Sequence, residues 1–268
     1  MLKTRAITAL LLAAGLLATL FLLPAVWAAA IFAGIAALAA WEWGELLQTG
    51  DIERRMFAAV TFLLCAALYV AGMPRPLLLA LWLPALLFWL LLVPLWLTRK
   101  WQLNANAIGF LIGWLLLIPC WAGMVMLHSR SPLFLLATMM LVWIADIAAY
   151  FAGCTFGKHK LAPAISPGKT WEGAAGAVAA VIVYGVILGW GNNKLALLTP
   201  VQIVLAMAGL ILLTVVSIIG DLFESLVKRQ AGVKDSSQLL PGHGGVLDRI
   251  DSLLSTLPII GLLSLFLF

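Results

Sequence analysis

The feature that most constrains the fold is a series of apolar runs, each long enough to cross a lipid bilayer. A helix that spans the hydrocarbon needs about 20 apolar residues, and runs of this length recur along the whole chain. Only 10% of the 268 residues are charged and 64% are hydrophobic, whereas a soluble domain carries about 25% charged residues. We therefore predict an all-α, polytopic transmembrane helical bundle. The nine predicted spans are residues 6–23, 25–41, 56–71, 77–97, 107–127, 132–152, 173–191, 200–221 and 252–268.

The basic residues predict how these spans are oriented, because Lys and Arg concentrate in cytoplasmic loops. If the N-terminus is cytoplasmic, 13 of the 16 Lys and Arg residues fall inside, and only Arg75, Arg130 and Lys194 fall outside. If one span were missed or added, the basic residues would no longer fall mainly on one side of the membrane. We therefore predict an N-inside, C-outside protein, with residues 1–131 as N-terminal transmembrane helices and 132–268 as a second region that holds most of the polar residues. Its two large polar segments, 153–172 and 222–251, would both face the cytoplasm.

Tryptophans and prolines add two expectations about the spans. Tryptophans recur near the predicted span ends, which is typical of an aromatic belt at the membrane interface. Prolines inside a span remove a backbone hydrogen bond and are expected to kink the helix. The tryptophans are Trp27, Trp41, Trp43, Trp96, Trp101, Trp121, Trp171 and Trp190, and the prolines are Pro84, Pro94 and Pro119.

The densest polar block of the chain is Ser225–Asp251, which reads SLVKRQAGVKDSSQLLPGHGGVLDRID. Its cations suit phosphates, its carboxylates suit a divalent metal, and its glycines permit close backbone approach. His243 lies in a turn where it has room to meet a ligand. The cations are Lys228, Arg229, Lys234 and Arg249, the carboxylates are Asp235, Asp248 and Asp251, and the glycines are Gly244 and Gly245.

Carboxylates are expected to converge at one membrane depth. Asp221 and Glu224 lie at the cytoplasmic end of one predicted span, and Asp248 and Asp251 lie at the cytoplasmic start of the last one. Asp146 lies within another predicted span, one to two turns from the cytoplasmic surface. Two bare carboxylates about 4 Å apart repel by about 4 kcal/mol at an effective dielectric near 20, so such a cluster needs cations. All-oxygen ligands favour Mg²⁺ or Mn²⁺. Two alternatives stay open: a structural hydrogen bond for Asp146, and helix capping for Asp248 and Asp251.

A second basic segment, GCTFGKHKLAPAISPGKTWEG, joins the sixth and seventh predicted spans. Ser166, Lys169 and Thr170 come directly before the seventh span. Free N–H groups at a helix start, with a lysine and two hydroxyls, can hold phosphate. The alternative is that the basic residues of this segment only obey the positive-inside rule.

These residues together resemble the bacterial phosphatidate cytidylyltransferases, also called CDP-diacylglycerol synthases. The family signature runs Ser-x-apolar-Lys-Arg, four residues, Lys-Asp, and later Pro or Gly before x-His-Gly-Gly-apolar-x-Asp-Arg-apolar-Asp. Every fixed position matches in this chain: Ser225, Lys228, Arg229, Lys234, Asp235, Pro241, His243, Gly244, Gly245, Asp248, Arg249 and Asp251. The resemblance is strong over residues 140–251 and weak over the first 130.

The resemblance implies that CMP passes from CTP to phosphatidate, giving CDP-diacylglycerol and pyrophosphate. It implies a homodimer in the bacterial inner membrane, with the active site facing the cytoplasm and no nucleic-acid partner. It further implies Mg²⁺, or Mn²⁺, with a second metal ion as an option. The expected catalytic residues are Asp221, Asp248 and Lys169, and the expected metal ligands are Asp221, Asp248, Asp251 and Asp146. The expected substrate-binding residues are Ser166, Lys169, Thr170, Lys228, Arg229, Lys234, His243, Gly244, Gly245 and Arg249.

Two other functions remain open at this point. A CTP-dependent kinase of a polyprenol or phytol type shares the need for CTP and metal, but we would not expect the whole signature there. An ion-coupled transporter could also gather intramembrane carboxylates. Transporters place them near the midplane between repeated halves, whereas here they cluster at one interface and no repeat is visible.

Overall fold

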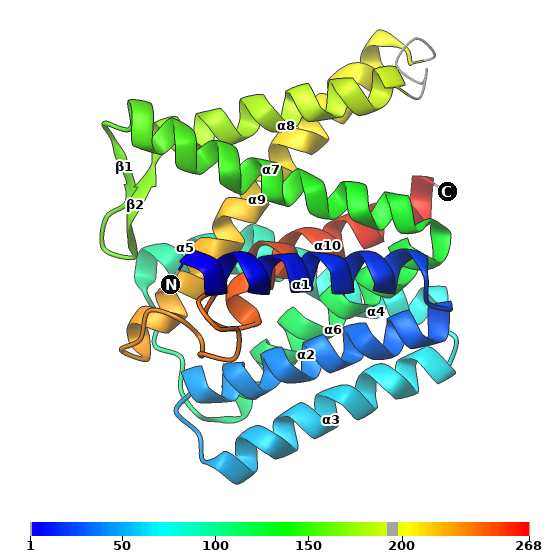
Figure 1. The fold of residues 1–268 in the computed structure, drawn as a ribbon, viewed down its shortest axis with the longest axis vertical. Helices are drawn as coiled ribbons and strands as arrows, with labels where there is room; N and C mark the ends of the chain where they lie inside the picture. The colour runs from blue at the N-terminus through cyan, green and yellow to red at the C-terminus, as the bar shows by residue number, and fades with distance from the viewer. Residues whose placement is uncertain (1, 192–197, 268) are drawn as a thin grey trace.

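The computed structural model describes residues 2–191 and 198–267 and is a bundle of long helices (Figure 1). Each predicted span corresponds to one helical segment, so the polytopic helical fold is confirmed. Lys194 lies outside the described residues. The helices are α1 (Leu2–Phe21), α2 (Ala25–Leu46), α3 (Asp51–Val70), α4 (Arg75–Leu87), the π-helix η1 (Phe88–Leu92), α5 (Val93–Arg99), α6 (Ala107–Arg130), α7 (Pro132–Phe156), α8 (Trp171–Gly191), α9 (Pro200–Gln230) and α10 (Leu247–Leu267).

Seven of these segments are long and apolar enough to cross a membrane within the part of the chain that the structure describes. The α4–η1–α5 series counts as one of them, over Arg75–Arg99, and the apolar part of α1 is shorter, over Arg5–Phe21. The remaining helix, α3, begins with charged residues and is not among the seven. The polytopic character is therefore clear from length and composition.

The chain ends and loops divide between two ends of the bundle (Figure 1). The N-terminus lies at the same end as the α2–α3 connection, the α5–α6 connection and the loop after α9. The turns α1–α2, α3–α4 and α6–α7 lie at the opposite end, with the C-terminus. Successive helices therefore alternate in direction, as the distribution of basic residues predicts.

Two of the interior prolines flank a distorted helical segment, whereas Pro119 lies within the uninterrupted helix α6. Pro94 has no N–H to donate to the fourth residue before it, and the five residues of η1 lie directly before this point, between Pro84 and Pro94. The distorted segment packs aromatic rings around Phe223 of α9. The ring centroids of Phe88 and Trp89 lie 5.7 Å and 5.8 Å from that of Phe223, both edge to face. This packing braces α9 two residues from Asp221.

The expected tryptophan belt is correct for only some of the tryptophans. Trp27, Trp171 and Trp190 are exposed, but Trp43 and Trp121 are fully buried. Their indole N–H groups donate to backbone carbonyls of neighbouring helices: Trp43 to Gly109 at 3.0 Å, and Trp121 to Ala29 at 3.2 Å. A satisfied N–H removes the cost of burying the indole, so these two rings form part of the core instead.

The predicted turn-rich segment between α7 and α8 contains regular structure. Strands β1 (Lys160–Ala162) and β2 (Ser166–Thr170) form an antiparallel pair, with Lys160 opposite Thr170 and Ala162 opposite Ser166. A two-stranded sheet with local pairing fits within one short connection, and it leads directly into α8. The hairpin therefore determines where the residues before α8 lie.

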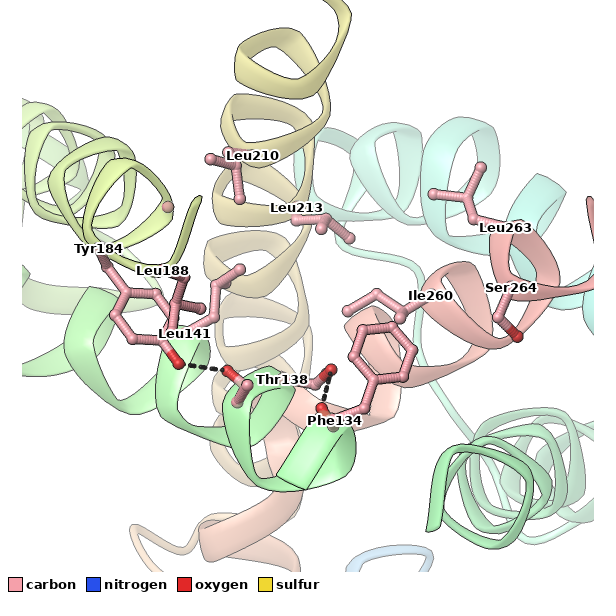
Figure 2. Close-up of a pocket in the computed structure, with 12 residues that line it drawn as sticks. Phe134, Thr138, Leu141, Tyr184, Leu188, Leu210, Leu213, Ile260, Leu263 and Ser264 are labelled. Carbon is pink, nitrogen blue, oxygen red and sulfur yellow. Dashed lines mark hydrogen bonds between the residues drawn. The ribbon is translucent and has the colours of Figure 1, made fainter. Parts of the chain in front are cut away.

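An apolar pocket of about 280 Å³ lies between α7, α8, α9 and α10 (Figure 2). Leu141, Leu213 and Ile260 line it together with Tyr184, whose hydroxyl donates to Ala137 O at 3.0 Å. The tyrosine's polar atom is thereby satisfied, and the pocket surface is hydrocarbon. The same helices α7, α9 and α10 carry Asp146, Asp221 and Asp251.

Candidate active site

The first part of the site is an ion pair between the hairpin and α9. Lys169 Nζ lies 2.6 Å from Asp221 Oδ2, and both side chains are about one-quarter exposed. Lys169 precedes the last residue of β2, so the β1–β2 pairing holds it, while the aromatic packing on Phe223 holds Asp221. Lys169 belongs to the polar segment 153–172, and Asp221 directly precedes the polar segment 222–251. Their meeting supports the expectation that both segments serve one site.

Two further carboxylates surround this pair. Asp146 of α7 interacts electrostatically with both Asp221 and Lys169. Asp251 of α10 interacts with Asp221 and with Asp146. Gly220 allows this approach, because a Cβ there would stand 3.0 Å from the backbone oxygen of Asp251. The structure therefore brings three of the four predicted metal ligands into electrostatic range of one another, with Lys169 near Asp146 and Asp221 and with Lys228 acting on Asp251.

The fourth predicted ligand, Asp248, belongs to a neighbouring cluster centred on Lys228. Lys228 Nζ lies 2.6 Å from Asp248 Oδ1 and 2.5 Å from Glu224 Oε2. The helix α9 continues to Gln230, beyond the predicted span end, so Glu224 and Lys228 are one turn apart on its surface. Glu224 is buried and its Oε1 has no hydrogen-bond partner in the described structure.

Asp248 also organises the loop before α10. Its Oδ2 accepts hydrogen bonds from Gly245 N at 2.8 Å and from Ser236 N at 2.9 Å. Asp248 lies in the first turn of α10 and accepts from an N–H just before the helix, which agrees with the alternative that its carboxylate stabilises the start of this helix. A metal at Asp248 would have to share oxygens that already accept these bonds and the Lys228 contact. Its role as a metal ligand stays a prediction.

Tight turns explain the glycines of the signature. Gly244 has φ +81°, in the left-handed region that glycine adopts without strain. A Cβ at Gly244 would stand 2.7 Å from Asp248 Oδ2, and one at Gly245 would stand 2.6 Å from Glu42 Oε1. These glycines therefore let the loop close on its carboxylates. Their contact with a nucleotide stays a prediction.

Arg249 and His243 are joined within the same loop. Arg249 donates to the His243 carbonyl oxygen through Nε at 3.0 Å and through Nη2 at 2.6 Å. The imidazole Nδ1 of His243 is buried and has no hydrogen-bond partner among the described residues. Arg249 thus binds the backbone of its own loop, and the Nδ1 atom of His243 is available to accept a hydrogen bond from a ligand or to donate one to it.

The remaining predicted substrate residues differ in their surroundings. Thr170 is buried and accepts from Gly173 N at 3.0 Å, so it caps α8. Ser166 lies half-buried on β2 near Lys169. Arg229 and Lys234 are exposed, and Arg229 Nη1 donates to Val233 O at 3.2 Å. Whether these residues contact phosphate stays a prediction.

Besides Ser236 and Ser237, sequence analysis missed a carboxylate of this region, Glu42 of α2. Its side chain is fully buried, and it accepts hydrogen bonds from Ser236, Ser237, Val246 and Leu247. The only sequence signal was a carboxylate inside an apolar run, flanked by Trp41 and Trp43. An intramembrane acid is unusual, and that signal could have drawn attention to it.

The donors of the site fit a hard cation. All the carboxylates are oxygen ligands, as Mg²⁺ prefers, and the buried Glu224 Oε1 lacks a partner. Over residues 2–191 and 198–267, however, no three His, Cys, Asp or Glu side chains converge closely enough to form a metal site. Lys169 and Lys228 contact these carboxylates instead.

Comparison with known proteins places this site in a family. A family model described as the cytidylyltransferase family matches residues 3–267. The chain belongs to that family. Its relatives include a phosphatidate cytidylyltransferase of Pseudomonas aeruginosa, 44% identical over 97% of this chain and 95% of that protein. One of Haemophilus influenzae is 36% identical over 96% of each chain.

Another relative matches over a shorter stretch of the chain. The phosphatidate cytidylyltransferase of Staphylococcus saprophyticus is 43% identical over 133 residues, which is 48% of each chain. Membership of the cytidylyltransferase family favours a nucleotidyltransferase over the transporter alternative. It also agrees with the resemblance that the signature indicates.

Proposed function

We propose that this protein transfers CMP from CTP to phosphatidate, giving CDP-diacylglycerol and pyrophosphate. A phosphate oxygen of the lipid attacks the α-phosphorus of CTP. The bond from that phosphorus to the bridging oxygen breaks, and pyrophosphate leaves with the electron pair. The observation that carries the proposal is the contact of Lys169 with Asp221, because it joins the first polar segment of a cytidylyltransferase-family chain to the residue that directly precedes the second.

Phosphoryl-type transfer depends on positioning and charge neutralisation more than on covalent help from the protein. Lys169 and Lys228 each contact carboxylates in the structure, at 2.5–2.6 Å. A triphosphate is a stronger competitor for a lysine than one carboxylate, since it offers several charged oxygens. We propose that Lys169 moves from Asp221 to a CTP phosphate when the nucleotide binds.

This exchange would free Asp221 beside Asp146 and Asp251. Three adjacent carboxylates without their lysine would repel one another, and these are the residues that would hold Mg²⁺. When bound, the ion supplies charge neutralisation between the reacting phosphates. Loss of the Lys169 contact and gain of a metal would thus be coupled events.

The position of the site suits a lipid substrate. Asp146, Asp221 and Asp251 lie on helices that also line the apolar pocket, five, eight and nine residues from Leu141, Leu213 and Ile260 respectively. At about 1.5 Å of rise per residue, the carboxylates and the pocket are about 8–14 Å apart along the helices. A phosphate at the carboxylates would therefore leave its acyl chains within reach of hydrocarbon.

The orientation and the assembly belong to the same proposal. We propose nine spans with the N-terminus in the cytoplasm of a bacterial inner membrane, so that CTP reaches the site from that side. The alternating ends seen in Figure 1 and the 13 inside basic residues support this orientation. We also propose a homodimer, which the resemblance implies.

The direct test is an assay of the purified protein with labelled CTP, phosphatidate and Mg²⁺. The expected products are a lipid that carries CMP and one pyrophosphate per turnover. A parallel reaction with a polyprenol tests the lipid-kinase alternative, whose product would be a phosphorylated lipid and CDP. Formation of only that product, or of neither product, would refute the proposed function.

A further inference from the structure

The carboxylate of Glu42, near the C-terminal end of α2, pairs with neither Lys169 nor Lys228. It is fully buried, and no Lys or Arg forms an ion pair with it among the described residues. A buried carboxylate without a cation is costly unless hydrogen bonds satisfy it. Glu42 therefore needs its partners, and the identity of those partners indicates what it does.

The partners of Glu42 come from both ends of one loop. Oε1 accepts from Ser237 Oγ at 2.6 Å and from Val246 N at 2.8 Å. Oε2 accepts from Ser236 Oγ at 3.1 Å and from Leu247 N at 2.6 Å. Two of these donors begin the loop and two end it, so a single carboxylate closes residues 236–247 into a ring.

The backbone donors strengthen this closure. Val246 and Leu247 lie at the start of α10, where N–H groups have no partner within the helix. A negative charge at that position also interacts favourably with the helix dipole. Glu42 thus caps α10 from a different helix, more than 200 residues earlier in the chain.

Ser236 connects Glu42 to the site. Its Oγ lies 3.1 Å from Asp248 Oδ2 as well as from Glu42, and its backbone N donates to the same Asp248 oxygen at 2.9 Å. Asp248 in turn contacts Lys228. Movement of the loop end at Ser236 would therefore shift Asp248 relative to Lys228.

We propose that Glu42 is a positioning residue of the transfer reaction: its carboxylate holds the two ends of residues 236–247 together, and so places Asp248 against Lys228. The proposal rests on the proposed function for its kinetic consequence. It also gives the N-terminal helices a role in a site otherwise built from the second half of the chain. Thr8 of α1 adds a second contact, to Pro241 O at 3.1 Å.

The decisive variant is Glu42→Gln, which keeps the shape but points an NH₂ group at two of the four donors. Two buried donors would then lose their acceptor and the two loop ends would no longer be held together, so we expect kcat per folded protein to fall by about tenfold or more. Hydrogen exchange of the amides in residues 236–247 should accelerate in the same variant, without substrates. Glu45→Gln is the matched control, since Glu45 is on the same helix but pairs with Arg54 at the surface.

A double-mutant cycle separates positioning from simple loss of stability. Ser236→Ala and Glu42→Gln should be non-additive in kcat, because both break the same connection to Asp248. A purely structural role would reduce the amount of folded protein while kcat and KM of the folded fraction stayed at wild-type values. That result, or unchanged hydrogen exchange over residues 236–247, would overturn the proposal.

The same experiment distinguishes this inference from the proposed function. If the wild-type protein forms no CDP-diacylglycerol, the proposed function fails. Faster hydrogen exchange in Glu42→Gln, with Glu45→Gln unchanged, would then still show that Glu42 closes the loop. An active wild type with a fully active Glu42→Gln variant would leave the function intact and refute the positioning role.

Discussion

At the scale of single residues, the site consists of carboxylates whose partners differ. Asp221 pairs with Lys169, Asp248 and Glu224 share Lys228, and Glu42 has only neutral donors. These pairings give each residue a distinct expected effect on substitution. They also mean that removing one partner leaves the other charge partly buried, which costs more than the lost contact alone.

Lys169 provides the first prediction at this scale. Lys169→Ala should lower kcat/KM for CTP. The loss of transition-state stabilisation should be about 1.5–3 kcal/mol, the range for a hydrogen bond to a charged group. Lys160→Ala is the control, because Lys160 lies in the paired strand of the same hairpin but is exposed. Steady-state kinetics with varied CTP measure both. Equal losses in the two variants would show that Lys169 has no special contact with CTP. The basic residues of the hairpin would then serve only to orient the protein in the membrane.

The proposed metal provides the second prediction at the scale of single residues. Asp221→Asn keeps the shape and removes the charge, so turnover should fall by about 100-fold or more while the protein stays folded. EDTA should abolish wild-type activity, and Mg²⁺ or Mn²⁺ should restore it. Asp51→Asn, at the exposed start of α3, is the charge-matched control and should be near neutral. Full activity in EDTA would refute the metal mechanism.

At the scale of elements, the site depends on how closely α9 approaches α10. Gly220 lies where the two helices meet: a Cβ there would stand 2.5 Å from Ser255 Oγ and 3.0 Å from the Asp251 backbone oxygen. The next residue is Asp221. The spacing of these helices therefore sets how far Asp221 lies from Asp251.

Gly220→Ala tests this packing. The added methyl group should push the helices apart and destabilise the protein by about 1–3 kcal/mol, as overpacking usually does. Activity should fall with it, because Asp221 moves away from Asp251. Gly209→Ala, on the same helix, has nothing within 4 Å of the new Cβ. It should be neutral or raise the melting temperature, since alanine favours helix over glycine by about 1 kcal/mol.

Thermal unfolding in detergent, together with turnover at a fixed temperature, compares the two variants. A Gly220→Ala protein as stable and active as Gly209→Ala would show that the helix contact is not limiting. The comparison is well matched because helix propensity changes equally in both variants. Only the surroundings of the new methyl group differ.

At the scale of the whole molecule, the proposed orientation places the site in the cytoplasm. Cys154 is the exposed cysteine among the three native ones, so Cys154→Ser provides a background for labelling. In that background, Val233→Cys, in the loop after α9, should react with a membrane-impermeant thiol reagent only from the cytoplasmic side. Ser131→Cys, between α6 and α7, should react only from outside. Reaction of both from one side would refute nine alternating spans.

The sequence by itself determined the bundle and the reaction class, because both depend on local signals. An apolar run of span length is helical in a membrane whatever its neighbours, since every backbone group must be satisfied within the segment. The signature likewise lies in 27 consecutive residues, Ser225 to Asp251. Hydropathy therefore predicted the helices, and the polar motifs drew attention to the charged residues around Lys169 and Lys228, whose roles stay predictions.

Only the tertiary structure decided how those residues pair. Glu42 meets Val246 and Leu247 across 204 and 205 residues of chain, and no local pattern predicts such a contact. The same holds for the buried Trp43 and Trp121, and for the division of the carboxylates between Lys169 and Lys228. Each depends on which helix faces arrive at one point, and packing across the whole bundle determines that.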